Sequence, residues 1–369
     1  MDTPALYINK QQIKDAFSNL TNALPGVNIA YAIKANPHKD IIGHLLNLDS
    51  RFETASIAEI NHLLSLGIDS KNIIFSNPVK PKLAIDQACQ SGVNIQSFDS
   101  LMEIEKFRGV QGIRPVLRLQ VPNEGSLWPL SDKFGCPPFH WDNLFKKLAA
   151  EKVPLSGFTF HVGSQAESLT SWDAALQLTL QAWKSSLQYG LKPQLLNIGG
   201  GFPIHLGRKT PTISQIAERI YTGLSQFKKE GLEVNELWAE PGRYVVGSAG
   251  YLFSKVIGVA KREKGTWVFL DCGVFSGMME TIDGITYPIK SSAKGPRQKV
   301  TLCGPSCDSV DTMFEVEMNL PEQNDIICFT GTGAYTNVYA SQFNGFMPPE
   351  TKIVESVEDL PEIQSQITI

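Results

Sequence analysis

The sequence has no dominant charge of either sign and no long hydrophobic run. Its 33 Lys and Arg residues are nearly balanced by 37 Asp and Glu residues, which gives a net charge of −4. Without a basic stripe, binding to nucleic acid has no electrostatic support. No apolar stretch is long enough to span a bilayer, and the first residues lack the charged start and apolar core of a signal peptide. These absences predict a cytoplasmic protein that binds neither nucleic acid nor a membrane.

Cysteine is also scarce, with six residues spread over a chain of 369. A chain of this length can bury a large core without disulfides, so we expect reduced thiols. Cys303 and Cys307 have a CxxxC spacing, but no second Cys or His pair of matching spacing accompanies them. We therefore expect no metal site.

The main pattern that the sequence does contain is a series of eight short apolar runs, each bounded by turn residues. Helical patterns lie between most of them, for example at Ser56–Leu66 and Pro211–Phe227. This alternation predicts a parallel sheet, and eight such units predict a closed (β/α)8 barrel. The predicted strands are Asn28–Lys34, Arg51–Ser56, Asn72–Asn77, Asn94–Asp99, Pro115–Val121, Gly157–Ser164, Leu195–Gly201 and Glu236–Gly242.

The chain is longer than one barrel requires, so we expect a second domain. After Arg243 the helical periodicity fades and short β segments follow. Ala5–Ile8 has no helical partner before it and is expected to join the same sheet. We therefore predict an α/β fold in which a TIM-like barrel (19–248) precedes a C-terminal β domain (249–369), with an N-terminal segment (1–18) contributing to that domain. The predicted β segments are Tyr251–Ala260, Trp267–Val274, Ile285–Ile289, Lys299–Cys303 and Asp325–Thr330.

The carboxyl ends of the predicted barrel strands carry chemically active side chains, and barrel active sites lie at these ends. Lys34 is the most informative of them, because an ammonium at the end of an apolar strand is costly to bury unless it has chemistry to perform. Taken alone, Lys34 is more simply explained as a surface lysine, but the other strand ends favour a site. The residues at these ends are Lys34, Ser56, Asn77, Asp99, Arg118, His161, Ser164, Gly199–Gly201, Glu240 and Arg243.

Three consecutive glycines, Gly199–Gly201, end the seventh predicted strand. They allow backbone N–H groups to approach an anion closely, and barrels commonly bind phosphate after strands seven and eight. The eighth strand is followed by Gly242 and Arg243, whose guanidinium can fork onto phosphate oxygens. Glycine triplets alone often only make turns, but together with Arg243 they favour a phosphate site.

A lysine, a phosphate site and the strand-end carboxylate Glu240 are the groups needed to hold pyridoxal phosphate. The amine of Lys34 would form a Schiff base with the aldehyde, and Glu240 would keep the pyridine nitrogen protonated. Two simpler interpretations remain open, with Glu240 as a salt-bridge partner of Arg243 and His161 as an ordinary core histidine. The nearby Ser164 favours a position of His161 against the flat face of the ring.

A series of motifs gives the chain a resemblance to a known family, the fold-type III pyridoxal-phosphate decarboxylases of basic amino acids. It is most similar to the bacterial ornithine and lysine/ornithine decarboxylases, which have the alanine racemase-like fold. Any one motif would be weak, but all of them occur in order over nearly the whole sequence. They are Tyr31-Ala-Ile-Lys34, Phe160-His-Val-Gly-Ser-Gln165, Gly199-Gly-Gly-Phe-Pro203, Glu240-Pro-Gly-Arg243, Cys303-Gly-Pro-Ser-Cys-Asp308, and Gly333-Ala-Tyr-Thr336 with Phe343-Asn-Gly-Phe346.

The resemblance implies pyridoxal 5'-phosphate as the cofactor. By similarity, Lys34 is the Schiff-base lysine, His161 stacks on the cofactor ring, and Glu240 pairs with its nitrogen. The residues that resemble the phosphate shell are Ser164, Gly199, Gly200, Gly201, Gly242, Arg243 and Tyr335.

The resemblance also implies a homodimer with shared active sites, because in this family the C-terminal motif enters the site of the partner subunit. Cys307 resembles the residue that reprotonates the substrate Cα, Asp308 the acid that binds its distal ammonium, and Phe343 a further substrate contact. Lys133 and Asp311 resemble a cross-subunit salt bridge. Taken alone, the Cys307 motif is a turn of small residues, and Lys133 and Asp311 are solvated charges.

The implied reaction is decarboxylation of ornithine, lysine or both to putrescine or cadaverine, as in polyamine biosynthesis. Where eukaryotic ornithine decarboxylases have Asn-Asp-Gly-Val-Tyr, this chain has Asp271-Cys-Gly-Val-Phe275, so the acid nearest the substrate amine aligns with Cys272. The two substrates are therefore not ranked, and a modified diamino acid or a D-amino acid remains open. A different kind of hypothesis is that the protein is a non-catalytic regulatory homologue. The presence of Lys34, Glu240 and Cys307 disfavours this hypothesis.

Overall fold

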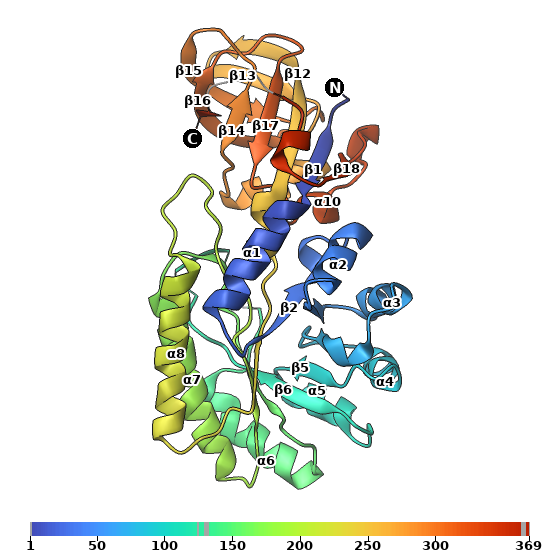
Figure 1. Cartoon of the computed structure of the whole chain (residues 1–369), viewed down its shortest axis with the longest axis vertical. Helices are drawn as coiled ribbons and strands as arrows, with labels where there is room; N and C mark the ends of the chain where they lie inside the picture. The colour runs from blue at the N-terminus through green and yellow to red at the C-terminus, as the bar shows by residue number, and fades with distance from the viewer. Residues whose placement is uncertain (1, 124, 129–132, 363–366, 369) are drawn as a thin grey trace.

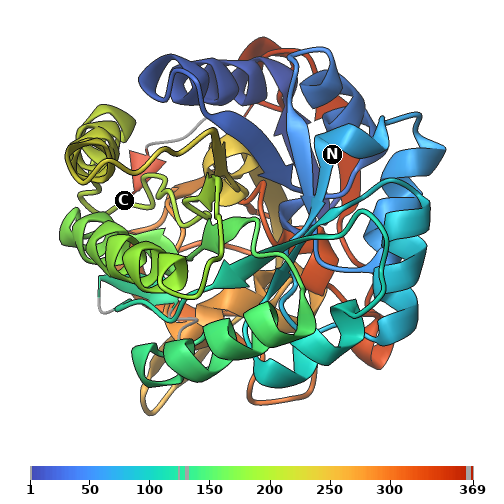
Figure 2. The ribbon, with the colours of Figure 1, turned by 90° about the horizontal axis from the view of Figure 1, so that it is seen from below.

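The computed structural model describes residues 2–123, 125–128, 133–362 and 367–368. Eight parallel strands close into a barrel, which confirms the predicted architecture, and Figure 2 shows helices as a ring around them. Around the barrel the order is β10 (Leu195–Asn197), β11 (Glu236–Ala239), β2 (Asn28–Ala32), β3 (Arg51–Thr54), β4 (Ile73–Phe75), β5 (Ile95–Phe98), β6 (Arg114–Arg118) and β8 (Gly157–Thr159).

Helices between the strands cover the outer face of the barrel. Polar caps begin several of them: the Asn9 side chain accepts from the N–H of Gln12, and Thr212 and Gln215 form a capping box. Their apolar sides, such as the one that carries the buried Ile216, face the strands. The helices are α1 (Lys10–Ala23), α2 (Lys39–Leu46), α3 (Ile57–Ser65), α4 (Lys82–Gln90), α5 (Leu101–Phe107), α6 (Trp141–Glu151), α7 (Thr170–Leu187) and α8 (Ile213–Lys229).

A second, nine-stranded sheet forms the upper domain in Figure 1. The first strand of the chain, β1 (Ala5–Asn9), belongs to it as predicted, since it pairs antiparallel with β12 (Gly250–Arg262) and parallel with β18 (Glu350–Val354). The chain therefore begins in the β domain, builds the barrel and returns to the β domain. The remaining strands of this sheet are β13 (Gly265–Leu270), β14 (Ile289–Ser291), β15 (Arg297–Cys303), β16 (Thr312–Asn319), β17 (Ile326–Thr330) and β19 (Ile367–Thr368).

Each barrel strand ends earlier than the apolar run that predicted it, because the last residues of the run leave the sheet to form the loops that face the site. Lys34 is an example, since β2 ends at Ala32 and Lys34 lies in the 3-10 turn η1 (Ile33–Ala35). In the β domain, the predicted strand Ile285–Ile289 is wrong except for its last residue, where β14 begins. The strands β16, β18 and β19 were not predicted.

Several short elements complete the described chain. Two of them, β7 (Ser126–Trp128) and β9 (Ser164–Ala166), pair as a small antiparallel sheet. The others that concern the site are α9 (Arg243–Val246), η5 (Val274–Met278) and η6 (Met279–Asp283). Within the described ranges, none of the helices combines the length and apolar character that crossing a membrane requires.

Candidate active site

A cavity of about 300 Å³ opens at the carboxyl ends of the barrel strands. The barrel supplies most of its wall, and Glu280, Tyr335 and Tyr339 of the C-terminal part of the chain supply the rest. The structure thus brings together residues that are far apart in the sequence. The predicted cofactor residues that line this cavity are Lys34, His161, Ser164, Gly201, Glu240, Gly242, Arg243 and Tyr335.

The other strand-end residues divide into two groups. Asn77 and Arg118 line the cavity, and the Arg118 guanidinium lies 5.0 Å from the centroid of the Phe134 ring. Ser56 and Asp99 do not line it. Ser56 caps α3, and Asp99 accepts a hydrogen bond from a backbone N–H at 2.9 Å, so both have structural roles.

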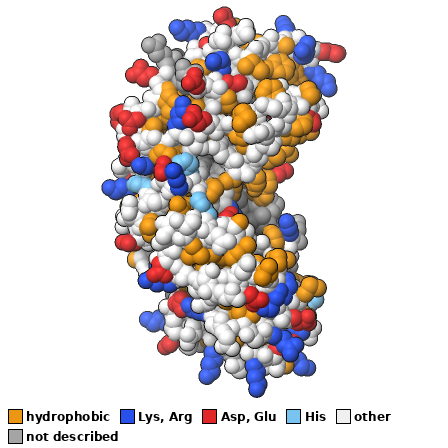
Figure 3. Space-filling model, turned by 90° about the vertical axis from the view of Figure 1, so that its right-hand side faces the viewer, with side chains coloured by type: hydrophobic (Ala, Val, Ile, Leu, Met, Phe, Trp, Pro, Cys, Tyr) orange, Lys and Arg blue, Asp and Glu red, His pale blue; other side chains and the backbone are white. Residues whose placement is uncertain are grey.

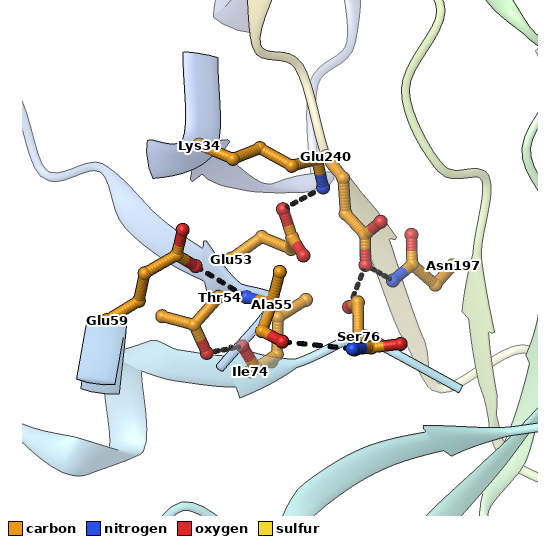
Figure 4. A network of polar contacts seen from close by, with 10 residues as sticks. Lys34, Glu53, Thr54, Ala55, Glu59, Ile74, Ser76, Asn197 and Glu240 are labelled. Atoms are coloured by element: carbon orange, nitrogen blue, oxygen red, sulfur yellow. Dashed lines mark hydrogen bonds and ion pairs between the residues drawn. The ribbon is translucent and has the colours of Figure 1, made fainter. Parts of the chain in front are cut away.

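Lys34 is paired with an acid that the sequence did not single out. Its Nζ donates to Oε2 of Glu53 at 2.6 Å, and Figure 4 shows the two side chains pointing toward each other. Glu53 comes from β3, next to β2 in the barrel, and its side chain is 1% exposed. Burial lowers the pKa of Lys34, but Glu53, with smaller contributions from Tyr335 and Glu240, more than offsets this and raises the pKa above its ordinary value. The lysine is therefore held as an ammonium.

Glu240 follows β11 and has one oxygen fixed by hydrogen bonds. Ser76 Oγ and Asn197 Nδ2 both donate to Oε1, the latter at 2.6 Å (Figure 4). Burial and the nearby charge of Glu53 raise the pKa of Glu240. The alternative that Glu240 serves as the salt-bridge partner of Arg243 is wrong, because Arg243 pairs with Glu280.

His161 lies just after β8 with its imidazole in a defined orientation. The backbone N–H of Gly163 donates to Nδ1 at 3.0 Å, so Nδ1 is the unprotonated nitrogen. Burial, followed by the positive charges of Arg118 and Lys34, lowers the pKa of His161 well below its ordinary value. The ring is therefore neutral.

The glycine triplet has a conformation and a closeness of contact that exclude side chains. Gly199 and Gly201 have φ values of +65° and +96°, in the left-handed region. A Cβ on Gly200 would lie 2.6 Å from the carbonyl oxygen of Glu240 and 3.1 Å from Nε2 of His161. The strand-seven loop therefore needs glycine at all three positions, although only Gly201 lines the cavity itself.

Arg243 is buried at the edge of the cavity and is held by Glu280. Nη1 donates to Oε2 of Glu280 at 2.9 Å, and Nη2 donates to Oε1. The guanidinium carbon also lies 5.0 Å from the centroid of the Tyr335 ring. Burial lowers the pKa of Arg243, but Glu280, with smaller contributions from Tyr287 and Tyr335, more than offsets this and raises the pKa above its ordinary value.

The predicted substrate residues do not line the cavity of their own chain. Cys307 and Asp308 are exposed and border a depression on the surface of the β domain, and Phe343 is 39% exposed. Asn344 fixes this group, because its Oδ1 accepts from the Cys307 N–H at 3.2 Å and from the thiol at 3.3 Å. Figure 3 shows hydrophobic side chains gathered on one face of the β domain and beside the waist below it.

Asp311 and Cys272 are both buried. Asp311 accepts from the N–H groups of Val274 at 2.7 Å and Ser306 at 2.9 Å, so its carboxylate braces the loop that carries Cys307. Cys272 Sγ donates to the Ser276 carbonyl at 3.5 Å and does not line the cavity. Position 272 therefore lies outside the wall of the cavity in the single chain.

Sequence reasoning missed four polar residues that fix the site: Glu53, Ser76, Asn197 and Glu280. Glu53, Ser76 and Asn197 lie at or just after the ends of β3, β4 and β10, so the strand-end rule is a signal that could have found them. Glu280 is not at a strand end: it lies in η6 of the β domain, within the segment Gly277-Met-Met-Glu-Thr-Ile-Asp283, and it meets Arg243 only in the folded chain. No cluster of three or more His, Cys, Asp or Glu side chains suited to a metal ion occurs in the part of the chain that the structure describes.

Comparison with known proteins gives a consistent result. The family model described as pyridoxal-dependent decarboxylase, pyridoxal binding domain, matches residues 10–247. Lysine/ornithine decarboxylase of Selenomonas ruminantium is 32% identical over an alignment of 380 positions, which covers 99% of this chain and 92% of that protein. Antizyme inhibitor 2 of Xenopus laevis is 32% identical over 348 residues, 88% of this chain and 75% of that protein. The crystal structure of lysine/ornithine decarboxylase complexed with cadaverine from Vibrio vulnificus superposes with a TM-score of 0.86 at 28% identity and covers 95% of this chain and 94% of that one.

Proposed function

Because the chain belongs to the pyridoxal-dependent decarboxylases, we propose that it removes the α-carboxylate of a basic amino acid, ornithine or lysine, and releases the corresponding diamine. The observation that carries this proposal is the joint placement of Lys34 and Glu240 in one cavity, beside a loop of three glycines. Those are the groups that attach, activate and anchor pyridoxal phosphate.

The cavity fits this cofactor in its chemistry. Lys34 supplies the amine, and Oε2 of Glu240 accepts no hydrogen bond from the described residues, so it is free to pair with a pyridine N–H. The Nε of Arg243 is buried and has no hydrogen-bond partner in the described part of the chain, as expected if an anion accepts from it. The phosphate would be held by Arg243, Ser164, Tyr335 and the backbone of Gly199–Gly201.

When bound, pyridoxal phosphate supplies an aldehyde for covalent attachment and a ring that withdraws the electron pair left by departing carbon dioxide. Glu240 would hold a proton on the ring nitrogen, which would make this withdrawal effective. Neutral His161 would present an uncharged face to the ring, so no imidazolium would oppose the ring's positive charge. Glu53 would hold the ammonium of Lys34 when that lysine is not attached to the cofactor.

We further propose that the active enzyme is a homodimer in which Cys307 and Asp308 serve the cavity of the partner subunit. Cys307 would donate its Sγ proton to the substrate Cα, and Asp308 would pair with the distal ammonium. Their exposure on the β domain, away from their own cavity, supports this arrangement. Phe343 would form an apolar wall, and the dimer would be cytoplasmic and act in polyamine biosynthesis.

A substrate panel tests the reaction. Purified protein with pyridoxal phosphate is incubated with L-ornithine, L-lysine, their D-forms, L-arginine or meso-diaminopimelate, and amines are identified by mass spectrometry. We expect putrescine, cadaverine or both, together with a near-visible absorption band that Lys34→Ala abolishes. Cofactor binding without any amine would contradict the proposed activity and would favour a specialised substrate, or a regulatory role such as the name of the Xenopus relative indicates.

A further inference from the structure

Glu280 occupies one of the two hydrogen-bonding edges of Arg243, and the other edge is only partly paired among the described residues. A planar guanidinium presents two pairs of roughly parallel N–H groups, one formed by Nη1 and Nη2 and the other by Nε and Nη2. Glu280 fills the first pair, with Nη1 donating to Oε2 at 2.9 Å and Nη2 donating to Oε1. The orientation of the whole guanidinium plane is thereby fixed.

The second edge of Arg243 faces the predicted phosphate site. Its Nη2 donates a long hydrogen bond to Oγ of Ser164 at 3.5 Å, and its Nε is buried without a hydrogen-bond partner among the described residues. Leaving a buried donor unpaired is costly, so Nε indicates an acceptor that the described residues do not supply. Ser164 and Arg243 both line the cavity.

Glu280 is itself held in place from the β domain. The Tyr287 hydroxyl donates to Oε2 of Glu280 at 2.9 Å, and both side chains are buried, each with 5% of its surface exposed. Glu280 lies in η6, whereas Arg243 begins α9 directly after the barrel. The contact therefore joins the two domains at the phosphate end of the cavity.

We propose that Glu280 is a positioning residue for cofactor binding, which orients Arg243 so that its Nε and Nη2 edge is offered to the cofactor phosphate. The inference rests on the proposed function, because it presumes that the cofactor binds in this cavity. The negative charge of Glu280 also repels a phosphate. If Glu280 favours phosphate binding, the gain from orienting Arg243 must therefore be larger than the loss from this repulsion. Orientation and repulsion predict opposite effects of removing the carboxylate.

Equilibrium binding of two probes to the cofactor-free protein tests this inference. Pyridoxal phosphate and pyridoxal differ only in the phosphate, and both are titrated spectroscopically into wild type, Glu280→Gln and Glu280→Asp. We expect both variants to bind pyridoxal phosphate about 10- to 100-fold more weakly, the range for losing hydrogen bonds to a charged group, with pyridoxal unchanged. Glu280→Asp is the sharper variant, because it keeps the charge but shortens the reach to Arg243.

Tighter binding of pyridoxal phosphate to Glu280→Gln, with Glu280→Asp unchanged, would overturn the proposal in favour of simple repulsion. Equal weakening of both probes would also overturn it, because the effect would then not involve the phosphate. Tyr287→Phe removes one contact to Glu280 without changing charge, and it should cause a smaller loss in the same direction if the Glu280 variants fail to fold. Exposed Glu317→Gln is the silent control. If wild type binds neither probe, the proposed function itself fails.

Discussion

The Nζ of Lys34 lies 2.6 Å from Oε2 of the buried Glu53, so the lysine expected to attach the cofactor is stored as a charged pair. An ammonium has no lone pair with which to attack an aldehyde. Cofactor attachment therefore requires Lys34 to lose a proton that Glu53 stabilises. Two carboxylates lie near one amine, and the proposed function gives them separate tasks: Glu53 holds the amine's proton, and Glu240 would pair with the ring nitrogen.

Glu53→Gln should make cofactor attachment faster at neutral pH. Glu53 raises the pKa of Lys34, so its replacement lowers that pKa and increases the neutral fraction of the amine. The pH midpoint of attachment should fall by about one to three pH units, the usual effect of one close opposite charge. The measurement is the rate at which the near-visible band appears as a function of pH. Glu59→Gln is the matched control, because Glu59 bonds the Ala55 N–H instead of Lys34, and an equal change in both variants would refute the assignment.

Glu240→Gln should bind the cofactor but decarboxylate slowly. Glutamine fills the same space, yet it cannot hold a proton on the ring nitrogen, so kcat at saturating cofactor should fall by about 10²- to 10⁴-fold. Ser76→Ala removes one hydrogen bond to Oε1 and leaves the carboxylate in place, so its kcat should change little. A kcat of Glu240→Gln equal to that of wild type would show that the carboxylate has no part in the chemistry.

Mixing two inactive variants should restore activity if the sites are shared. Lys34→Ala and Cys307→Ala disable opposite halves of the proposed composite site, so a mixed dimer has one complete site. After random reassortment, about a quarter of wild-type activity is expected. A mixture of Lys34→Ala and Glu240→Gln should stay inactive, because both changes affect the same half. No recovery in the first mixture, with dimers demonstrated by light scattering, would contradict the shared site.

Lys80 should make stability depend on pH. It is 1% exposed and donates to the carbonyl of Asn77 at 2.8 Å and to that of Ser97, two acceptors that the two N–H groups of a neutral amine can serve. Burial lowers its pKa from 10.5 to about 7. Between these values the unfolded chain binds more protons than the folded one, so the contribution of Lys80 to the free energy of unfolding rises with pH.

Lys80→Met should flatten this rise, which denaturant unfolding at several pH values between about 7 and 10 would measure. Exposed Lys71→Met is the control and should keep the wild-type slope. Parallel curves for wild type and Lys80→Met would mean that Lys80 remains charged in the folded protein.

The barrel could be predicted because each of its strands is an apolar run that ends in a turn. Interactions across the fold leave no such local pattern. Glu280 is one acid in an irregular segment, and only folding brings it to Arg243. The strand β16 alternates apolar and charged residues and is largely exposed on one face, so it lacks the continuous apolar run by which the barrel strands were found. Cys272 was interpreted from its place in a motif, but its burial separates it from the cavity.

The path of the chain through the two domains also constrains the order in which the protein is built on the ribosome. The strand β1 emerges first, but its neighbours β12 and β18 lie at Gly250–Arg262 and Glu350–Val354. The barrel strands are complete at Ala239, long before β18 is translated. During synthesis, β1 therefore has neither of its partner strands while the residues of the barrel are being translated. Domains that fold as units during translation would form the barrel first, and the arrival of β18 would close the molecule.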